Sequence, residues 1–142
     1  MNMINQFGSG VFACVMDSYD YAFALDKLIP SIAKLKLEKG GVMIIRPDSG
    51  DPVETVIMAL QAGEKVFGVK KNKKGFKVLN GCGVIQGDGV NPQTIKAILD
   101  KALSLGFSAQ NIAFGMGGGL LQVNFNYLFS SVSSFVYVIN TL

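Results

Sequence analysis

The sequence predicts an α/β fold built on a parallel sheet. Short apolar runs alternate with segments of helical periodicity, and three polar, glycine-containing loops each follow directly after an apolar run. A strand, a glycine-rich loop, a helix and another strand in this order are typical of parallel sheets with crossover helices. The chain has 142 residues, of which 49% are hydrophobic, so it can bury a core of its own. We therefore expect one α/β unit.

The first strand is expected at residues 11–16 (VFACVM) and a helix at 20–28. Pro30 interrupts the helical pattern, because proline lacks a backbone N–H and clashes with the preceding turn. A second helical stretch is expected at 31–39, ended by two glycines. Residues 42–46 (VMIIR) then read as the second strand, since β-branched residues dominate this run.

A long helix is expected after Asp51, which suits the N-cap position, with Pro52 in the first turn. Its apolar residues recur with helical spacing on one face: Val53, Val56, Ile57 and Leu60. Residues 68–80 form a polar, lysine-rich connection with a turn at Gly75. The pattern predicts an amphipathic helix packed on a sheet, followed by an exposed connection.

The same unit then repeats. A strand is expected at 83–86 (GVIQ), and a helix begins at Asn91 and ends before Gly106. The residues of its apolar face are Ile95, Ile98, Leu99 and Ala102. Another strand, 111–114, leads into a glycine run. Two consecutive strand–loop–helix units strengthen the prediction of a parallel sheet.

Charge and composition exclude several classes of protein. The net charge of +3 is too small to indicate a nucleic-acid partner. The basic residues cluster at one place: Lys70, Lys71, Lys73, Lys74 and Lys77. This cluster surrounds Gly75, so we expect a solvated hairpin tip and not an RNA-binding patch. The chain contains no histidine, which rules out a histidine nucleophile, base or metal ligand within it.

Cys14 and Cys82 both lie in apolar runs, and we expect buried free thiols in a reducing, cytoplasmic compartment. After Lys101 the chain has no charged residue. Asn and Ser interrupt the apolar segment 123–142, so we do not expect a membrane anchor there. The N-terminal residues lack the basic and continuous apolar parts of a signal peptide.

Three loops carry the residues suited to chemistry: 46–51 (RPDSGD), 87–90 (GDGV) and 115–119 (GMGGG). In a parallel sheet or barrel all of them fall at the carboxyl ends of strands, so they converge on one face. Arg46 can bind a phosphate, carboxylate or amide oxygen through its planar guanidinium. The carboxylates that reach this face are those of Asp17, Asp48 and Asp88. They could accept from ribose hydroxyls, bind Mg²⁺ or face a cationic transition state.

The third loop, 115–119, is suited to an anion. Its glycines let backbone N–H groups approach closely, and a helix starting near Leu120 would add its dipole. A simple tight turn is the alternative. Tyr19, near the first strand end, is expected to pack and not to stack on a ligand.

Structural alternatives exist for the other residues as well. Asp51 is better interpreted as a helix cap, and Asp48 or Ser49 could serve the same purpose. Asp17 could be an Asx-turn residue at a strand end. Arg46 could be a structural ion-pair partner.

Several motifs together resemble the nicotinamide phosphoribosyltransferase family. They are IIRPDSGDP (44–52), VIQGDGV (84–90) and NIAFGMGGGLLQ (111–122), in the family's order and spacing. The segments MDSYD (16–20) and KGFKVL (74–79) fit the same family. The resemblance covers residues from about 4 to 122.

The resemblance implies the type II phosphoribosyltransferase fold, so this chain would form the parallel-sheet part of an irregular α/β barrel. It further implies an active site shared across a homodimer. The implied reaction joins nicotinamide to 5-phosphoribosyl 1-diphosphate, giving nicotinamide mononucleotide and diphosphate, in NAD salvage. Mg²⁺ is the implied cofactor, and ATP is implied as a stimulating co-substrate.

The resemblance also implies roles for seven residues at the strand ends. They are the active-site carboxylates Asp17 and Asp48, the nicotinamide-contacting Arg46, the ribose-binding Gly87 and Asp88, and the phosphate-binding Gly117 and Gly118. These assignments agree with the chemistry that the residue types allow.

The sequence departs from the family pattern at two places. Residues 1–122 correspond to a partial barrel domain, whereas 123–142 form a divergent, uncharged tail in which Asn126 replaces a phosphate-binding arginine. The family's catalytic histidine and the acidic residue that favours nicotinamide lie upstream of the matched segment. We therefore expect this chain not to act alone. A non-catalytic ribose-phosphate-binding module and a nicotinate phosphoribosyltransferase are the alternatives.

Overall fold

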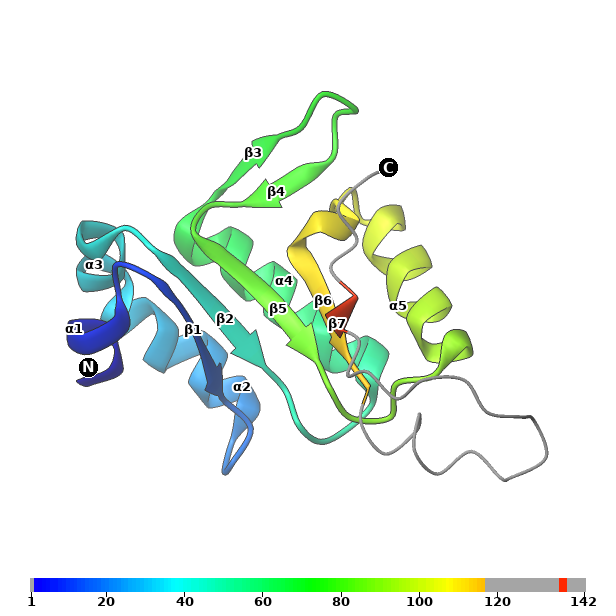
Figure 1. Ribbon diagram of the computed structural model, residues 1–142, viewed down its shortest axis with the longest axis horizontal. Coiled ribbons are helices and arrows are strands. Elements are labelled where there is room, and N and C mark those ends of the chain that lie inside the picture. The colour runs from blue at the N-terminus through cyan, green and yellow to red at the C-terminus, as the bar shows by residue number, and fades with distance from the viewer. Residues whose placement is uncertain (1, 117–135, 138–142) are drawn as a thin grey trace.

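The fold is an open α/β layer, in which helices cover one face of a mostly parallel sheet (Figure 1). The computed structural model describes residues 2–116 and 136–137. The sheet has the order β1-β2-β5-β6-β7. Its strands are β1 (Val11–Val15), β2 (Val42–Arg46), β5 (Cys82–Gln86), β6 (Ile112–Gly115) and β7 (Val136–Tyr137). The first four are parallel and β7 is antiparallel to β6, which confirms the predicted α/β class and parallel sheet.

The helical elements are α1 (Asn2–Phe7), α2 (Tyr21–Phe23), the π-helical turn η1 (Ala24–Leu28), α3 (Ile29–Lys39), α4 (Pro52–Phe67), α5 (Pro92–Ser104) and the 3₁₀ turn η2 (Ala109–Asn111). In the view of Figure 1, α3 and α4 lie behind the sheet and α5 lies beside β6. The short helix α1 was not predicted. No helix in the described part of the chain has both the length and the apolar character needed to cross a membrane.

The core lies between the sheet and the helices. Alternate strand residues such as Met43, Ile45 and Val84 are buried against the helix layer. Leu60 from α4 and Ile98 from α5 are fully buried in the same cluster. These are the faces that the helical periodicity predicted, because an amphipathic helix buries its apolar stripe against the sheet.

Both long helices begin with a side-chain cap, of which that of Asp51 was expected. The side chain of Asp51 accepts from the N–H groups of Val53 and Glu54 at 3.0 and 2.8 Å. Asn91 accepts from those of Gln93 and Thr94 at 3.0 and 2.9 Å. These bonds satisfy N–H groups that the first helical turn leaves without partners.

The predicted break at Pro30 is wrong. The chain stays helical from Tyr21 to Lys39, with η1 directly before α3. In this wider turn the N–H of Ile29 donates to the carbonyl of Ala24. Pro30 lies directly after this π-helical turn, at the start of the α-helical segment α3.

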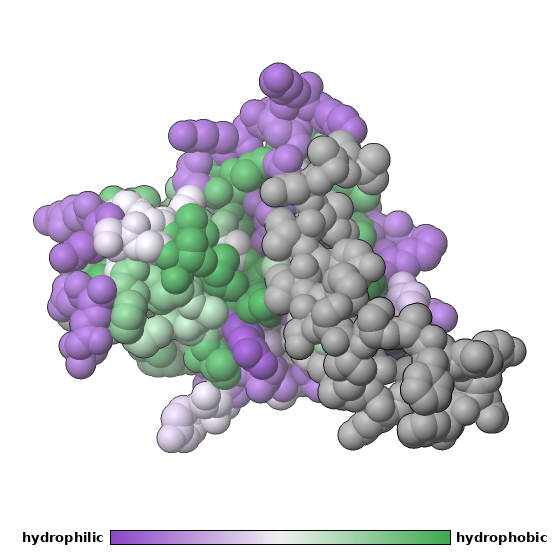
Figure 2. All heavy atoms as spheres, in the orientation of Figure 1, coloured by the Kyte–Doolittle hydropathy of each residue, from purple (hydrophilic) through white to green (hydrophobic). Residues whose placement is uncertain are grey.

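Residues 68–80 contain the expected hairpin. Its strands β3 (Val69–Lys71) and β4 (Lys77–Leu79) pair antiparallel. Gly75 has a φ of 85°, the left-handed conformation that the predicted turn requires. Lys70 and Lys71 are exposed, and the hairpin forms part of the hydrophilic region that projects at the top of Figure 2.

The opposite face of the sheet is not covered by the helices. Val11 and Val15 of β1 are 73% and 49% exposed, and Figure 2 shows apolar residues gathered over β1 and β2 on this face. The carboxyl ends of β1, β2 and β5 point the same way in Figure 1. The loops that follow these strands therefore meet at one edge of the sheet.

Candidate active site

The site is centred on Asp17, which follows β1, and on the loop that follows β2. The parallel register pairs Val15 with Arg46, so the residues after these two positions lie side by side. Oδ2 of Asp17 accepts from the backbone N–H of Asp48 at 2.7 Å and from Oγ of Ser49 at 2.6 Å. Asp17 thus holds the β2 loop to the end of β1.

The surroundings of Asp17 keep its carboxylate ionised. Partial burial by itself raises the pKa of Asp17, but the hydrogen bonds from Ser49 and from the backbone of Asp48 outweigh it and bring the pKa below its usual value. The carboxylate is therefore negative at neutral pH. Both of these bonds end on the same carboxylate oxygen, Oδ2.

Arg46 and Asp48 form an ion pair within the same loop. Nη2 of Arg46 lies 3.1 Å from Oδ1 of Asp48, and the two side chains are 43% and 48% exposed. An exposed pair of this kind stabilises a fold by about 1 kcal/mol at most, so its main effect is orientation. Nε of Arg46 is buried and has no hydrogen-bond partner among the described residues.

The second loop lies directly against Arg46. A Cβ placed on Gly87 would be 3.5 Å from Nη2 of Arg46, so the guanidinium faces the side of Gly87 on which a side chain would stand. A Cβ placed on Gly115, at the end of β6, would be 3.8 Å from Cα of Gly87. Gly87 therefore stands between Arg46 and the start of the third loop.

Asp88 projects from this second loop toward solvent. Its side chain is exposed, and no described residue donates a hydrogen bond or a charge to its carboxylate. Its carbonyl, by contrast, accepts from Nε2 of Gln86 at 2.7 Å. The backbone of Asp88 is thus held while its carboxylate remains available to a ligand.

The predicted site residues that can be placed come together. Asp17, Arg46 and Asp48 are joined by direct contacts, and the guanidinium of Arg46 faces Gly87. Asp88 follows Gly87 in the chain. Gly117 and Gly118 lie outside the described residues, so the phosphate-binding role of the third loop stays a prediction.

Two of the structural alternatives are resolved. Asp51 caps α4 as expected, and neither Asp48 nor Ser49 does so, because their groups bind Arg46 and Asp17. The packing predicted for Tyr19 is wrong: its side chain is fully exposed, at 102% of the reference area.

Sequence reasoning missed Gln86. It occupies the buried face of β5, two residues after Val84, and is 1% exposed. A polar side chain at a core-facing position of an apolar strand was the signal, because such positions are normally apolar. Ser49 was seen only as a cap, and its bond to Asp17 depends on a contact across the sheet.

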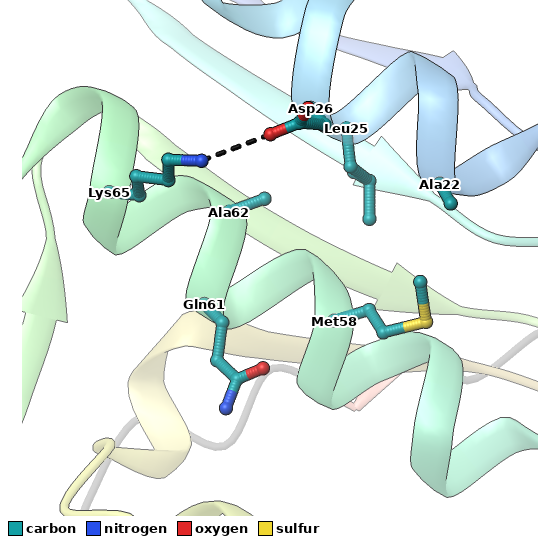
Figure 3. A pocket seen from close by; sticks show the side chains of 7 residues that line it. All are labelled: Ala22, Leu25, Asp26, Met58, Gln61, Ala62 and Lys65. Carbon is teal, nitrogen blue, oxygen red and sulfur yellow. Dashed lines mark hydrogen bonds and ion pairs between the residues drawn. The ribbon is translucent and has the colours of Figure 1, made fainter.

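The described helices also form an open groove of about 310 Å³ away from these loops (Figure 3). It lies between α2, η1 and α4, and an ion pair of 3.0 Å joins Asp26 and Lys65 at its rim. It contains none of the predicted site residues. Within residues 2–116 no group of three His, Cys, Asp or Glu side chains is arranged to hold a metal ion.

Comparison with known proteins identifies the family. The profile of the nicotinate phosphoribosyltransferase (NAPRTase) family matches residues 3–141. The chain belongs to this family. Its membership agrees with the parallel α/β sheet and with the strand-end site, and it confirms the resemblance to phosphoribosyltransferases that the loop motifs indicated.

Curated relatives within the family carry the name nicotinamide phosphoribosyltransferase. The one from Xanthomonas campestris pv. campestris is 45% identical over 124 residues, which cover 85% of this chain and 26% of the relative. Those from Mycoplasma pneumoniae and Mycoplasma genitalium are each 33% identical, covering 84% of this chain and 30% of the relative. The chain therefore spans between a quarter and a third of the length of these relatives.

Proposed function

We propose that this chain forms part of the active site of a nicotinamide phosphoribosyltransferase. The proposed reaction transfers the phosphoribosyl group of 5-phosphoribosyl 1-diphosphate to nicotinamide, giving nicotinamide mononucleotide and diphosphate for NAD salvage. The observation that carries the proposal is the contact network of Asp17, Arg46 and Asp48 beside Gly87 and the exposed carboxylate of Asp88. The choice of substrates comes from the curated relatives, which are named nicotinamide phosphoribosyltransferase.

The carboxylates suit the charge that develops during this reaction. Departure of diphosphate leaves an oxocarbenium-like ribosyl centre, and fixed negative charge close to it lowers the barrier. Asp17 meets this requirement because its pKa is lowered, and its position is fixed by the bonds from Asp48 and Ser49. Asp48 is held by Arg46 at the same edge.

Base and ribose are assigned to the first two loops. The Nη groups of Arg46 are partly exposed and can donate to the carboxamide oxygen of nicotinamide. The carboxylate of Asp88 can accept from the ribose hydroxyls, with Gly87 allowing the sugar to approach the backbone.

The phosphate group is assigned to the third loop by the capping pattern. Asp51 and Asn91 use the first N–H groups of α4 and α5, so neither helix offers free donors to an anion. The remaining candidate at this edge is the glycine loop containing Gly117 and Gly118. We propose that these two residues bind the 5′-phosphate.

Mg²⁺ and ATP are also part of the proposal. Mg²⁺ is commonly held by one or two carboxylates together with substrate phosphates, so it does not require a dedicated cage. Asp88 suits this role because its carboxylate is exposed, and the ion would neutralise charge on the departing diphosphate. We further propose ATP as a stimulating co-substrate, a cytoplasmic location, and a homodimer in which the partner copy completes the site.

Binding and turnover by the purified chain test the proposed function. We expect calorimetry to show binding of nicotinamide mononucleotide, lost in an Asp88→Ala variant and retained in Asp100→Ala, a matched exposed aspartate on α5. Absence of binding by the unaltered chain would contradict the proposal. Binding without product formation is the result expected of a chain that does not act alone, whereas product formation from nicotinamide and the phosphoribosyl donor would contradict that expectation. Product formation from nicotinate but not nicotinamide would favour the other base.

A further inference from the structure

We infer that Gln86 is a positioning residue that fixes the ribose-binding turn formed by Gly87, Asp88 and Gly89. This inference rests on the proposed function for the role of that turn. The side chain of Gln86 is 1% exposed, and its Nε2 donates to the carbonyl of Asp88 at 2.7 Å. The bond connects the buried face of β5 to the backbone of the loop above it.

The orientation of the amide follows from this bond. Exchanging its nitrogen and oxygen would place two oxygen atoms 2.7 Å apart, which is repulsive. In the orientation observed, Oε1 of Gln86 is buried and has no partner among the described residues. An unsatisfied buried acceptor destabilises a fold. An apolar side chain of similar length would avoid this penalty, so the amide is explained by the bond that it donates.

The turn is held at a second point by a residue of α5. Oγ1 of Thr94, in the first turn of α5, lies 2.9 Å from the carbonyl oxygen of Gly89 and 3.0 Å from that of Asn91, and its single proton is shared between these two acceptors. Gly89 has a φ of 62°, so the chain reverses sharply between the two held carbonyls. With Asp88 and Gly89 both fixed, the turn has little freedom to change its direction.

The consequence reaches the proposed ligand site. Holding the Asp88 carbonyl leaves its carboxylate exposed to solvent, and it keeps Gly87 facing the guanidinium of Arg46. A binding turn that is rigid before the ligand arrives loses less conformational entropy on binding. Gln86 therefore raises affinity without touching the ligand.

Gln86→Met separates this positioning role from a structural one. Methionine has nearly the same length and removes both the donor and the unpaired oxygen, so we expect an unchanged or higher melting temperature. Backbone order parameters of Gly87, Asp88 and Gly89 should fall from about 0.85 toward 0.6. Gln61→Met, the same change at an exposed position of α4, is the control and should alter neither quantity.

Relaxation and calorimetry together decide the outcome. We expect Gln86→Met to bind nicotinamide mononucleotide between about two- and tenfold more weakly, the range of one lost hydrogen bond. A turn as rigid as in the unaltered chain, or a chain that fails to fold, would overturn the inference. Equal affinity despite a loosened turn would also overturn it. If the unaltered chain does not bind the mononucleotide, the proposed function fails, and the relaxation data still decide whether Gln86 positions the turn.

Discussion

The backbone N–H of Asp48 donates to Oδ2 of Asp17 at 2.7 Å, although 31 residues separate them. This bond joins the loops after β1 and β2, and Ser49 adds a second bond to the same oxygen at 2.6 Å. Asp17 is thus an anchor for the loop that carries Arg46 and Asp48, in addition to its proposed electrostatic role.

Replacing Asp17 by Ala should release this loop. Both hydrogen bonds are lost, and because the cluster is open to solvent we expect a decrease of about 1 kcal/mol in the free energy of unfolding. Urea denaturation measures it. Ser49→Ala removes one of the two bonds and should cost less. Equal stability of Asp17→Ala and the unaltered chain would show that the loop does not depend on this anchor.

The contribution of Asp17 should depend on pH. Its pKa is lower in the folded chain than its ordinary value of 3.8, so folding favours the ionised form. The stabilisation that ionised Asp17 provides is complete at a pH above its ordinary pKa. It is lost as the pH falls through the lower pKa that Asp17 has in the folded chain. The difference in unfolding free energy between the unaltered chain and Asp17→Ala should therefore be constant from pH 7 to about 5 and shrink below about 4. A difference that grows on acidification would contradict this sign.

Replacing Arg46 by Lys should weaken ligand binding more than it affects the fold. Lysine keeps the charge and can still pair with Asp48, but it lacks the planar guanidinium that faces Gly87 and offers several donors to a ligand. We expect about tenfold weaker binding of nicotinamide mononucleotide by calorimetry and a change in stability within about 0.5 kcal/mol. A matched Lys27→Arg change at an exposed surface position should alter neither.

The strand-end loops could be predicted because each is determined by the local sequence. The apolar runs end where Arg46, Gly87 and Gly115 begin the three loops, and parallel strands bring such ends together. The bond between Asp17 and Ser49 was not predictable, because it depends on the pairing of Val15 with Arg46 across the sheet.

Other differences between prediction and structure also have physical causes. The helix continues through Pro30 because the π-helical turn before it changes the hydrogen-bond register, which periodicity does not reveal. Gln86 was overlooked because its strand is a nearly continuous apolar run. Such a run shows no alternation, so the sequence does not tell which face of the sheet its last, polar residue occupies.

The two neighbouring glycines of the second loop should respond differently to alanine. Gly89 has a φ of 62°, and a Cβ there would lie 3.2 Å from Cγ of Pro52, so we expect a loss of at least about 1 kcal/mol in stability. A Cβ on Gly87 would meet Arg46 at an ordinary contact distance of 3.5 Å. Gly87→Ala should therefore fold normally and weaken mononucleotide binding. Thermal melts and calorimetry on the two variants make the comparison, and a destabilised Gly87→Ala would contradict it.

Asn111 should be a determinant of stability remote from the site. It is 4% exposed, its Oδ1 accepts from the N–H of Leu79 at 2.8 Å, and its Nδ2 donates to the carbonyls of Lys77 and Ser108 at 2.8 and 2.9 Å. These bonds tie the hairpin strand β4 to the start of β6.

Asn111→Asp tests this network because it keeps the acceptor and removes only the two donated bonds. Two carbonyl oxygens would then face a buried carboxylate, so we expect a loss of about 3 kcal/mol or more in unfolding free energy at neutral pH. Protonation restores one donor and a neutral group, so the loss should diminish as the pH is lowered toward 5, by urea denaturation at each pH. Asn72→Asp is the comparison, at a less buried position in the hairpin turn. Oδ1 of Asn72 accepts from the N–H groups of Lys74 and Phe76, and an aspartate keeps both bonds, so this change should cost far less. Equal losses in the two variants would show that the donated bonds of Asn111 do not hold the hairpin to the sheet.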